Sequence, residues 1–299
     1  MLKDKVVLVT GAGRGIGRSI ALAMAEQGAR VVVNDLGVSL SGQGTGESPA
    51  DEVVSTIRAS GGEAVTSLDN IAQESGANAA VATAVRHFGR IDGVVNNAGI
   101  IRDNIFHKLS AADWDAVIQV HLYGSFHVSR AAAEHFRKQQ SGAYVHMTST
   151  SGLIGNVAQA NYSAAKMGIV GLSRSIALDM QRFKVRSNCI APYAWSRMVA
   201  AMPGWSEGEI AKRSKLMDPT TIGPLAALLV SDASADVSGQ IFSVRGNEIF
   251  LFSQPRPVRS VHRSEGWSVT SLTQHMLPSL KSSFTPLEDS RAVIGWDPI

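Results

Sequence analysis

Short runs of β-branched residues alternate along this sequence with longer, alanine-rich segments of helical period, and this alternation constrains the fold more than any other feature. Repeated strand–helix–strand units place their strands in parallel and cover both faces of the sheet with helices. We therefore expect an α/β fold with a doubly wound parallel sheet of about seven strands. The strand candidates are VVLV (6–9), VVVN (31–34), AVTSL (64–68), IDGVV (91–95), AYVHMT (143–148), VRSNCI (185–190) and QIFSV (240–244).

Length and composition favour a single domain, because 299 residues with 44% hydrophobic content suit one large core. The alternation stops after Gly246, and the prolines that follow predict an irregular extension. We expect a domain over 1–250 and a C-terminal extension over 251–299. The Gly/Ser-rich stretch 37–50 is expected to be an insertion between the second strand and its helix.

Charge and composition exclude several classes of protein. The chain has 28 Lys and Arg against 25 Asp and Glu without a long basic block, so nucleic acid is not expected as a partner. No run of 18 apolar residues occurs, so we expect no membrane span and a cytoplasmic location. The single cysteine, Cys189, excludes an internal disulfide and is expected to be a small core residue. No metal site is expected.

A cluster of glycines follows the first strand candidate and precedes a helical segment. Gly11, Gly15 and Gly17 let the backbone turn tightly and bring N–H groups at the start of a helix against a pyrophosphate. The pattern is T-G-x-x-x-G-x-G, because the G-x-G-x-x-G fingerprint would need glycine at Ile16. The cluster favours a Rossmann-like dinucleotide site, although alone it is also typical of a simple tight turn.

Asp35 ends the second strand, where a carboxylate can accept hydrogen bonds from both ribose hydroxyls of an adenosine. The alternative is a solvated aspartate at a strand end. Arg14 could instead receive a 2'-phosphate, but the Asp35 carboxylate would repel that phosphate. We therefore expect NAD rather than NADP as the cofactor.

A second group of polar residues lies in the C-terminal half of the chain. Tyr162 and Lys166 stand four residues apart in a segment rich in helix formers, so they share one helix face. Ser149 lies upstream at the end of a strand candidate. Taken singly, these residues are also typical of a half-buried aromatic, a solvated lysine and a helix cap.

Three motifs together resemble the short-chain dehydrogenase/reductase family. They are T-G-x-x-x-G-x-G at 10–17, N-N-A-G at 96–99, and Ser149 with Y-x-x-x-K at 162–166. The resemblance covers residues 5 to about 250, and three motifs in this order are far more specific than any one of them.

The resemblance implies hydride transfer between a nicotinamide cofactor and a carbinol or carbonyl carbon. Tyr162 would act as general base or acid, and the Lys166 ammonium would lower the pKa of the phenol from about 10. Ser149 would hydrogen-bond the reacting oxygen. The cofactor-binding residues implied are Gly11, Arg14, Gly15, Ile16, Gly17, Asp35, Asp69, Asn70, Asn96, Ala98, Gly99, Tyr162, Lys166 and Pro192.

The sequence departs from the family pattern at two positions. Where the helix after N-N-A-G usually carries an asparagine that completes a proton relay to the lysine, this chain has His121. An imidazole can hold a water as an amide does, but its charge can change near neutral pH. His121 is thus a candidate catalytic residue, with a satisfied core histidine as the alternative. Tyr193 follows Pro192 where the family usually has glycine.

A narrower resemblance extends to the (3R)-hydroxyacyl-CoA dehydrogenase domain of peroxisomal multifunctional enzyme type 2 and its stand-alone bacterial relatives. It rests on NNAGIIRDNIF (96–106), GNVAQANYSAAKMG (155–168) and IAPYAWSRM (190–198). The resemblance implies a 3-hydroxyacyl thioester from fatty-acid or sterol side-chain breakdown as substrate. It also suggests a homodimer or homotetramer.

Two segments are candidates for contact with such a substrate. The family has a substrate lid at about 193–217, where this chain carries Trp195, Met198, Met202, Trp205 and Met217. These side chains suit a bulky lipid, and they equally suit a lid that packs on its own domain. Arg256, Arg259 and Arg263 are expected to lie on a solvated or subunit-contact surface, with contact to CoA phosphates as the alternative.

Two other functions stay open. A hydroxysteroid dehydrogenase of the 17β type, or another secondary-alcohol dehydrogenase, would share the fold and the same catalytic residues. A dinucleotide-binding regulator without turnover is the remote alternative, and the set Ser149, Tyr162 and Lys166 argues against it because a sensor does not need those groups.

Overall fold

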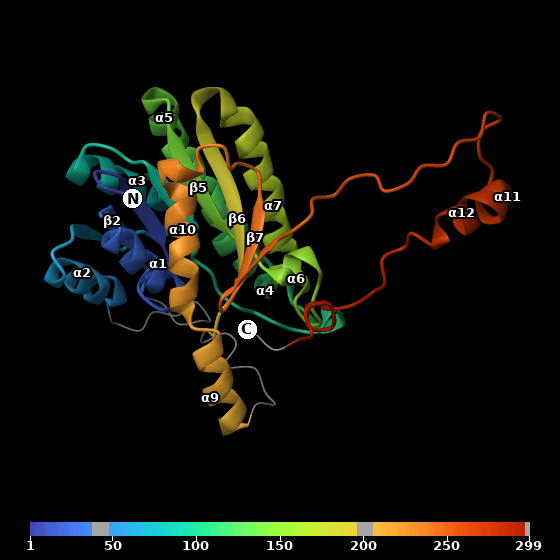
Figure 1. The fold of residues 1–299 in the computed structure, drawn as a ribbon, viewed down its shortest axis with the longest axis horizontal. Helices are drawn as coiled ribbons and strands as arrows, with labels where there is room; N and C mark the ends of the chain where they lie inside the picture. The colour runs from blue at the N-terminus through green and yellow to red at the C-terminus, as the bar shows by residue number, and fades with distance from the viewer. Residues whose placement is uncertain (38–47, 196–205, 297–299) are drawn as a thin grey trace.

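The computed structural model describes residues 1–37, 48–195 and 206–296, and these form one α/β fold around an eight-stranded sheet (Figure 1). The strand order is β3-β2-β1-β4-β5-β6-β7-β8, and every neighbouring pair is parallel except β7 and β8. The strands are β1 (Val6–Thr10), β2 (Arg30–Asn34), β3 (Ala64–Ser67), β4 (Gly93–Asn96), β5 (Gly142–Met147), β6 (Val185–Tyr193), β7 (Ile241–Arg245) and β8 (Glu248–Leu251).

Helices connect the parallel strands and cover both faces of the sheet, as the alternation in the sequence predicts. The α-helices are α1 (Gly15–Glu26), α2 (Pro49–Ala59), α3 (Glu74–Phe88), α4 (Ala111–Ile118), α5 (Gly124–Gln139), α6 (Thr150–Leu153), α7 (Ala160–Met180), α9 (Glu207–Leu216), α10 (Gly223–Val230), α11 (Val269–Ser271), α12 (Leu277–Lys281) and α13 (Ser290–Val293). The 3₁₀ and π-helical turns are η1 (Phe106–Lys108), η2 (Gln119–Tyr123), η3 (Gln181–Phe183), η4 (Pro219–Ile222), η5 (Asp232–Ser234) and η6 (Leu272–Met276).

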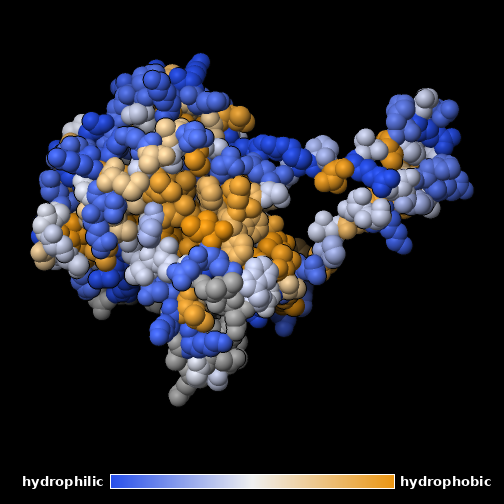
Figure 2. Space-filling model, viewed as in Figure 1, coloured by the Kyte–Doolittle hydropathy of each residue, from blue (hydrophilic) through white to orange (hydrophobic). Residues whose placement is uncertain are grey.

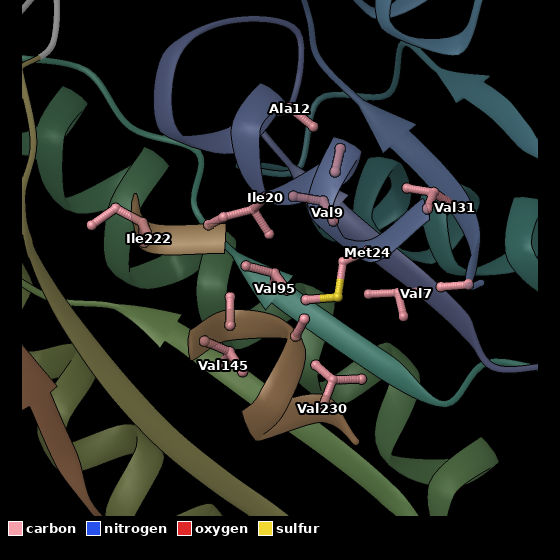
Figure 3. Close-up of a cluster of buried hydrophobic side chains, with 14 of the residues drawn as sticks. Val7, Val9, Ala12, Ile20, Met24, Val31, Val95, Val145, Ile222 and Val230 are labelled. Carbon is pink, nitrogen blue, oxygen red and sulfur yellow. The ribbon is translucent and has the colours of Figure 1, made fainter. Parts of the chain in front are cut away.

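Alternate side chains of each strand enter different cores, because successive side chains of a strand point to opposite faces. Val7 and Val9 of β1 pack with α1, α2 and α10 on one face (Figure 3). Val6 and Leu8 of the same strand pack with α3 and α5 on the other face. Both faces are therefore buried, which confirms the doubly wound sheet.

The sheet has one strand more than the sequence predicts. Beyond Gly246, where an irregular extension is expected, β8 pairs antiparallel with β7 through a tight turn at the positive-φ residue Gly246. The extension then leaves the body of the molecule as an arm, residues 253–288, that carries α11 and α12 (Figure 1). It returns as a C-terminal segment, residues 289–296, that contains α13.

Surface character differs between the body and the arm. The viewed face of the body shows a broad apolar area, whereas the arm is mainly hydrophilic (Figure 2). Exposed apolar side chains on α10 and β8 include Leu228, Ile249 and Leu251. In the part of the chain that the structure describes, no helix combines the length and hydrophobicity that a membrane span requires.

Candidate active site

The glycine turn after β1 has the tight geometry that a dinucleotide site requires. Gly11 and Gly15 adopt positive φ values of 61° and 55°, which L side chains rarely adopt. A Cβ built on Gly17 would lie 2.1 Å from Gly11 O, so only glycine fits there. A Cβ on Gly15 would meet no atom within 4 Å. The turn is thus packed beneath Gly17 and open above Gly15, as a cradle for a bound group would be.

Asn97 holds this turn against the loop that follows β4. Its Nδ2 donates to Thr10 O and to Gly11 O, both at 3.0 Å. The N–H groups of Asn97 and Ala98 in turn donate to Thr10 Oγ1, at 3.0 and 3.1 Å. Sequence reasoning missed Asn97 and Thr10, although both lie inside the motifs that it used.

Asp35 lies directly beyond β2 and reaches the glycine turn. Its Oδ2 accepts from the N–H of Gly13 at 2.9 Å, and its Oδ1 accepts from the N–H of Gly37 at 2.9 Å. The carboxylate is half-buried. Asp35 is therefore held in place by backbone groups beside the turn, with lone pairs left for a further donor.

Several other predicted cofactor residues lie at the same edge of the sheet in structural roles. Ile16 packs on the core, Arg14 is the residue before α1, and Pro192 is half-buried near the end of β6. Asp69 accepts from Ser67 Oγ at 2.8 Å, and Asn70 Oδ1 accepts from the N–H of Ala72 at 3.1 Å.

The Asn96 side chain does not face the edge of the sheet. It is buried between β5 and α5, where Nδ2 donates to Ser129 Oγ at 3.0 Å and lies 3.2 Å from His146 Nδ1. Only its backbone remains for a cofactor. Gly99 is confined instead by His121, since a Cβ on Gly99 would lie 2.3 Å from His121 Cε1.

The structure brings the three predicted catalytic side chains together. Ser149 caps the short helix α6, and its hydroxyl acts to lower the pKa of the Tyr162 phenol of α7. Lys166, one turn along α7, is buried with its Nζ 5.4 Å from the centre of the Tyr162 ring. Its ammonium donates to Met147 O at 2.7 Å. The end of β5 and the first turns of α7 therefore bring these three side chains into one cluster.

The charge state of this group differs from the sequence-based expectation. Burial raises the pKa of Tyr162 to about 12; the Ser149 hydrogen bond opposes that rise, and the Asp103 carboxylate adds to it. Burial also lowers the pKa of Lys166 to about 7. The pKa of the phenol is therefore raised overall in this structure, and the expected effect of the Lys166 ammonium on it stays a prediction.

His121 lies in the π-helical turn η2 between α4 and α5, and its ring packs edge-on against Tyr162 with the centroids 5.2 Å apart. Burial, followed by the Lys166 charge, lowers its pKa to about 3, so the imidazole stays neutral at physiological pH. Its Nε2 lies 3.1 Å from Ile100 N and 2.9 Å from Ile100 O. One nitrogen cannot serve both in one tautomer. The predicted role of His121 in a proton relay stays a prediction.

Sequence reasoning also missed a polar network around the catalytic serine. It consists of Asp103, Ser151, Asn156 and Gln159, which are linked to one another by side-chain hydrogen bonds. Each residue is ordinary by itself, and no local motif signals that they converge.

The segments expected to contact a substrate are described only in part. Trp195 and Met217 lie at the two ends of the expected lid and are joined by the hydrogen bond from Trp195 N to Met217 O at 2.5 Å. Met198, Met202 and Trp205 lie outside the described residues. Arg256, Arg259 and Arg263 lie on the arm, which leads away from the catalytic residues (Figure 1).

No group of three or more His, Cys, Asp and Glu side chains that could hold a metal ion occurs within 1–37, 48–195 and 206–296.

Comparisons with known proteins agree with this geometry. Residues 5–202 match the family described as short chain dehydrogenase. A crystal structure of a short chain dehydrogenase from Mycobacterium avium is similar with a TM-score of 0.84 and 40% identity, covering 95% of this chain and 97% of that one.

Three relatives of known sequence are also similar. A short-chain type dehydrogenase/reductase of Mycobacterium tuberculosis is 46% identical over 83% of this chain and 84% of its own length. The hydroxyacyl-CoA dehydrogenase ChsB1 of the same organism is 38% identical over 91% and 87%. Peroxisomal multifunctional enzyme type 2 of Mus musculus is 44% identical over 89% of this chain, which spans 35% of the mouse protein.

Proposed function

This chain belongs to the short-chain dehydrogenase/reductase family, and from that premise we propose that it oxidises the 3-hydroxyl group of a (3R)-hydroxyacyl-CoA with NAD. Family membership makes it an oxidoreductase that acts on CH–OH groups. The observation that supports the reaction is the cluster of Ser149, Tyr162 and the buried Lys166, in which Ser149 acts to lower the pKa of the Tyr162 phenol and Lys166 Nζ lies 5.4 Å from the centre of the Tyr162 ring.

The glycine turn fits a dinucleotide, since Gly15 leaves open space where a side chain would otherwise stand. The Asp35 carboxylate beside it supports NAD, because it can accept from ribose hydroxyls and repel a 2'-phosphate. NAD supplies a hydride acceptor when bound.

The residues of the chain handle the proton and the orientation of the substrate. Ser149 hydrogen-bonds the reacting oxygen, and Tyr162 accepts its proton as the hydride leaves the carbon. In the reverse direction the Tyr162 phenol returns that proton. Because its pKa is raised, Tyr162 is mostly protonated near neutral pH. A hydrogen bond from Ser149 and the charge of the protonated fraction of Lys166 must therefore favour the phenolate during oxidation.

The similarity to ChsB1 over most of both chains supports the acyl-CoA substrate. A nucleotide handle contributes binding energy far from the reacting carbon, and part of that energy can orient the carbinol against Tyr162. We expect a truncated thioester to lose kcat/KM steeply for this reason.

A substrate panel tests this assignment. The panel consists of (3R)- and (3S)-hydroxyacyl-CoA, the matching pantetheine thioester and a 17β-hydroxysteroid, each scored by NADH formation. We expect the highest kcat/KM with the 3R acyl-CoA. Preference for the 3S isomer, or steroid turnover above every thioester, would contradict the proposed substrate and favour a hydroxysteroid dehydrogenase.

Asp35→Ala tests the cofactor. Losing the ribose hydrogen bonds and the phosphate repulsion should narrow the preference for NAD over NADP by about 10-fold or more. The ratio of the two kcat/KM values measures this, with the exposed carboxylate variant Asp115→Asn as a control. Equal kcat/KM for both cofactors in the unmutated enzyme would rule out the role of Asp35.

The proposed enzyme has one catalytic domain with a C-terminal extension and assembles from identical subunits. Residues 1–250 form the catalytic domain and 251–299 an extension of it, in a cytoplasmic homodimer or homotetramer. The exposed Leu228, Ile249 and Leu251 support assembly, because side chains of this kind are commonly covered at subunit interfaces.

A further inference from the structure

The Ser151 hydroxyl is the centre of a polar network that the steps above do not use. Ser151 Oγ donates to Gln159 Oε1 at 2.8 Å and accepts from Asn156 Nδ2 at 2.8 Å. Ser149 Oγ donates to Ser151 Oγ at 3.2 Å and accepts from Ser151 N–H at 3.1 Å. Ser151 therefore contacts the catalytic serine through both its backbone and its hydroxyl.

One end of the network is the Asp103 carboxylate, which accepts from Gln159 Nε2 at 2.7 Å. Because an ionised carboxylate can only accept, the nitrogen of the Gln159 amide faces Asp103 and its oxygen faces Ser151. Ser151 must then donate to Gln159. Its lone pairs are left for Asn156 and Ser149.

The other end is Ser290, which lies at the start of α13 and 134 residues from Asn156 in sequence. The Ser290 hydroxyl donates to Asn156 Oδ1 at 2.6 Å, and its N–H donates to Gly155 O at 3.0 Å. The oxygen of the Asn156 amide thus faces Ser290, and its nitrogen faces Ser151. The direction set at Asp103 therefore runs through Gln159, Ser151 and Asn156, and the Ser290 hydroxyl completes the network as a donor.

Contacts outside the network hold Ser290 in place. Trp296 Nε1 donates to Glu248 Oε1 at 2.8 Å, and the Arg245 guanidinium lies 5.0 Å from the Trp296 ring and donates to Trp296 O at 2.6 Å. Tyr193 Oη donates to Ser290 O at 3.3 Å. The C-terminal segment is therefore anchored on β6, β7 and β8, and the arm does not determine where Ser290 lies.

We propose that this network positions Ser149 for catalysis, with Ser151 as its central positioning residue and Ser290 as the member that ties the C-terminal segment to the active site. The Ser151 N–H and the Ser151 hydroxyl hold the Ser149 oxygen in place before substrate arrives, and the Ser149 hydrogen turns from Ser151 to the reacting oxygen when substrate binds. The inference rests on the proposed role of Ser149 at the reacting oxygen, and it holds for any CH–OH substrate.

Ser290→Ala tests the remote end of the network. We expect kcat to fall about 10-fold, because a misplaced hydroxyl orients the reacting oxygen poorly. The dissociation constant of NADH should stay unchanged, since Ser290 contacts no part of the glycine turn. Ser290→Thr keeps the hydroxyl and should restore most of kcat. Ser264→Ala removes an exposed serine of the arm and should change nothing. Wild-type kcat in Ser290→Ala would overturn the proposal.

The pH dependence of kcat/KM separates positioning from mere stabilisation. Lys166, His121, Asp103 and Ser149 face Tyr162, and the Ser149 hydrogen bond lowers its pKa while Asp103 raises it. For the oxidation, in which Tyr162 must be deprotonated, Ser290→Ala should therefore shift the limb that rises with pH to higher pH, and Asp103→Asn should shift it to lower pH. Asp115→Asn should leave it unchanged. A Ser290→Ala variant with a lower Tm and an unshifted profile would make the segment structural only.

A double-mutant cycle tests the route through Asn156. If Ser290 acts through Asn156, Ser290→Ala should cost nothing further in an Asn156→Ala background. Independent, additive losses would overturn the route.

Turnover of another secondary alcohol, but not of hydroxyacyl-CoA, would contradict the proposed substrate alone. A crystal structure of Ser290→Ala with NADH is a readout independent of substrate, and an unmoved Ser149 side chain there would also overturn the proposal.

Discussion

The two sides of the active site are built by different means. The nucleotide side takes its shape from the backbone, with Gly11 and Gly15 at positive φ and Gly17 packed against Gly11 O. The catalytic side takes its shape from buried side chains, among them Tyr162 and Lys166. A site built from glycine backbone depends on the absence of side chains. A site built from side chains depends on which side chains are present and on their charge.

This difference predicts different failures. Adding a side chain at Gly17 should destabilise the glycine turn and weaken nucleotide binding, because a Cβ there would clash with Gly11 O. Removing an atom or changing a protonation state should damage the catalytic side, where burial shifts the pKa values of Tyr162, Lys166 and His121.

Tyr162→Phe should separate the two sides most sharply. The change removes the proton-transfer group and little volume, so kcat should fall by roughly 100-fold or more. NADH affinity, measured by fluorescence titration, should stay within experimental error because the glycine turn is untouched. A variant that keeps most of its kcat would mean that another group moves the proton.

Gly17→Ala should damage the nucleotide side. The new Cβ would lie 2.1 Å from Gly11 O and 2.5 Å from Asn97 Nδ2, so the turn must shift. We expect a loss of about 2–3 kcal/mol in the free energy of unfolding, together with weaker NADH binding. Gly15→Ala is the matched control, since its Cβ meets no atom and only the positive φ of 55° opposes it, at about 1 kcal/mol. Equal losses in urea titrations of the two variants would contradict this account.

Acid should destabilise the molecule through the buried histidines beside the catalytic side. Burial lowers the pKa of His146 to about 3, as it does for His121. An unfolded histidine titrates near 6.5, so the unfolded state binds the proton first and stability falls as pH drops from about 6.5 toward 3. Each histidine contributes up to about 1.4 kcal/mol per pH unit.

His146→Gln should therefore flatten the dependence of the urea midpoint on pH between 7 and 4. The exposed His262 of the arm serves as the control, and His262→Gln should leave the dependence as steep as before. A His146→Gln variant that is as acid-sensitive as the unmutated protein would assign the effect to other groups.

His121→Asn should have the smallest effect. An amide can accept from Ile100 N–H and donate to Ile100 O at once, which one imidazole nitrogen cannot do. We expect kcat to fall by less than about 10-fold, well short of the loss of a proton-transfer group. Near-complete loss of kcat in a folded variant would give His121 a direct role in catalysis.

The comparison also explains what the sequence could predict. The glycine turn and the pair Tyr162 and Lys166 are local patterns, so spacing alone identifies them. The antiparallel β8 was missed because its four residues follow the predicted end of the alternation. The raised pKa of Tyr162 could not be predicted, because its largest cause is burial, which no spacing reports.

Contacts between residues far apart in the sequence could not be predicted for a different reason. Asn156 and Ser290 meet across 134 residues, and the quoted segment 155–168 that contains Asn156 gives no sign of this contact. Asn97 lies inside a recognised motif, yet its role becomes visible only when β4 is placed next to β1. Residues of this kind are found from topology, since only topology says which strand ends are neighbours.

The contact of Asn97 with Thr10 and Gly11 has a consequence for folding. Asn97 is 86 and 87 positions from Gly11 and Thr10. The turn after β1 therefore lacks these two hydrogen bonds until β4 docks beside β1. Closing so long a loop costs entropy before any contact rewards it. A dinucleotide can therefore stabilise the finished sheet by mass action, but it cannot guide the earliest steps of its folding.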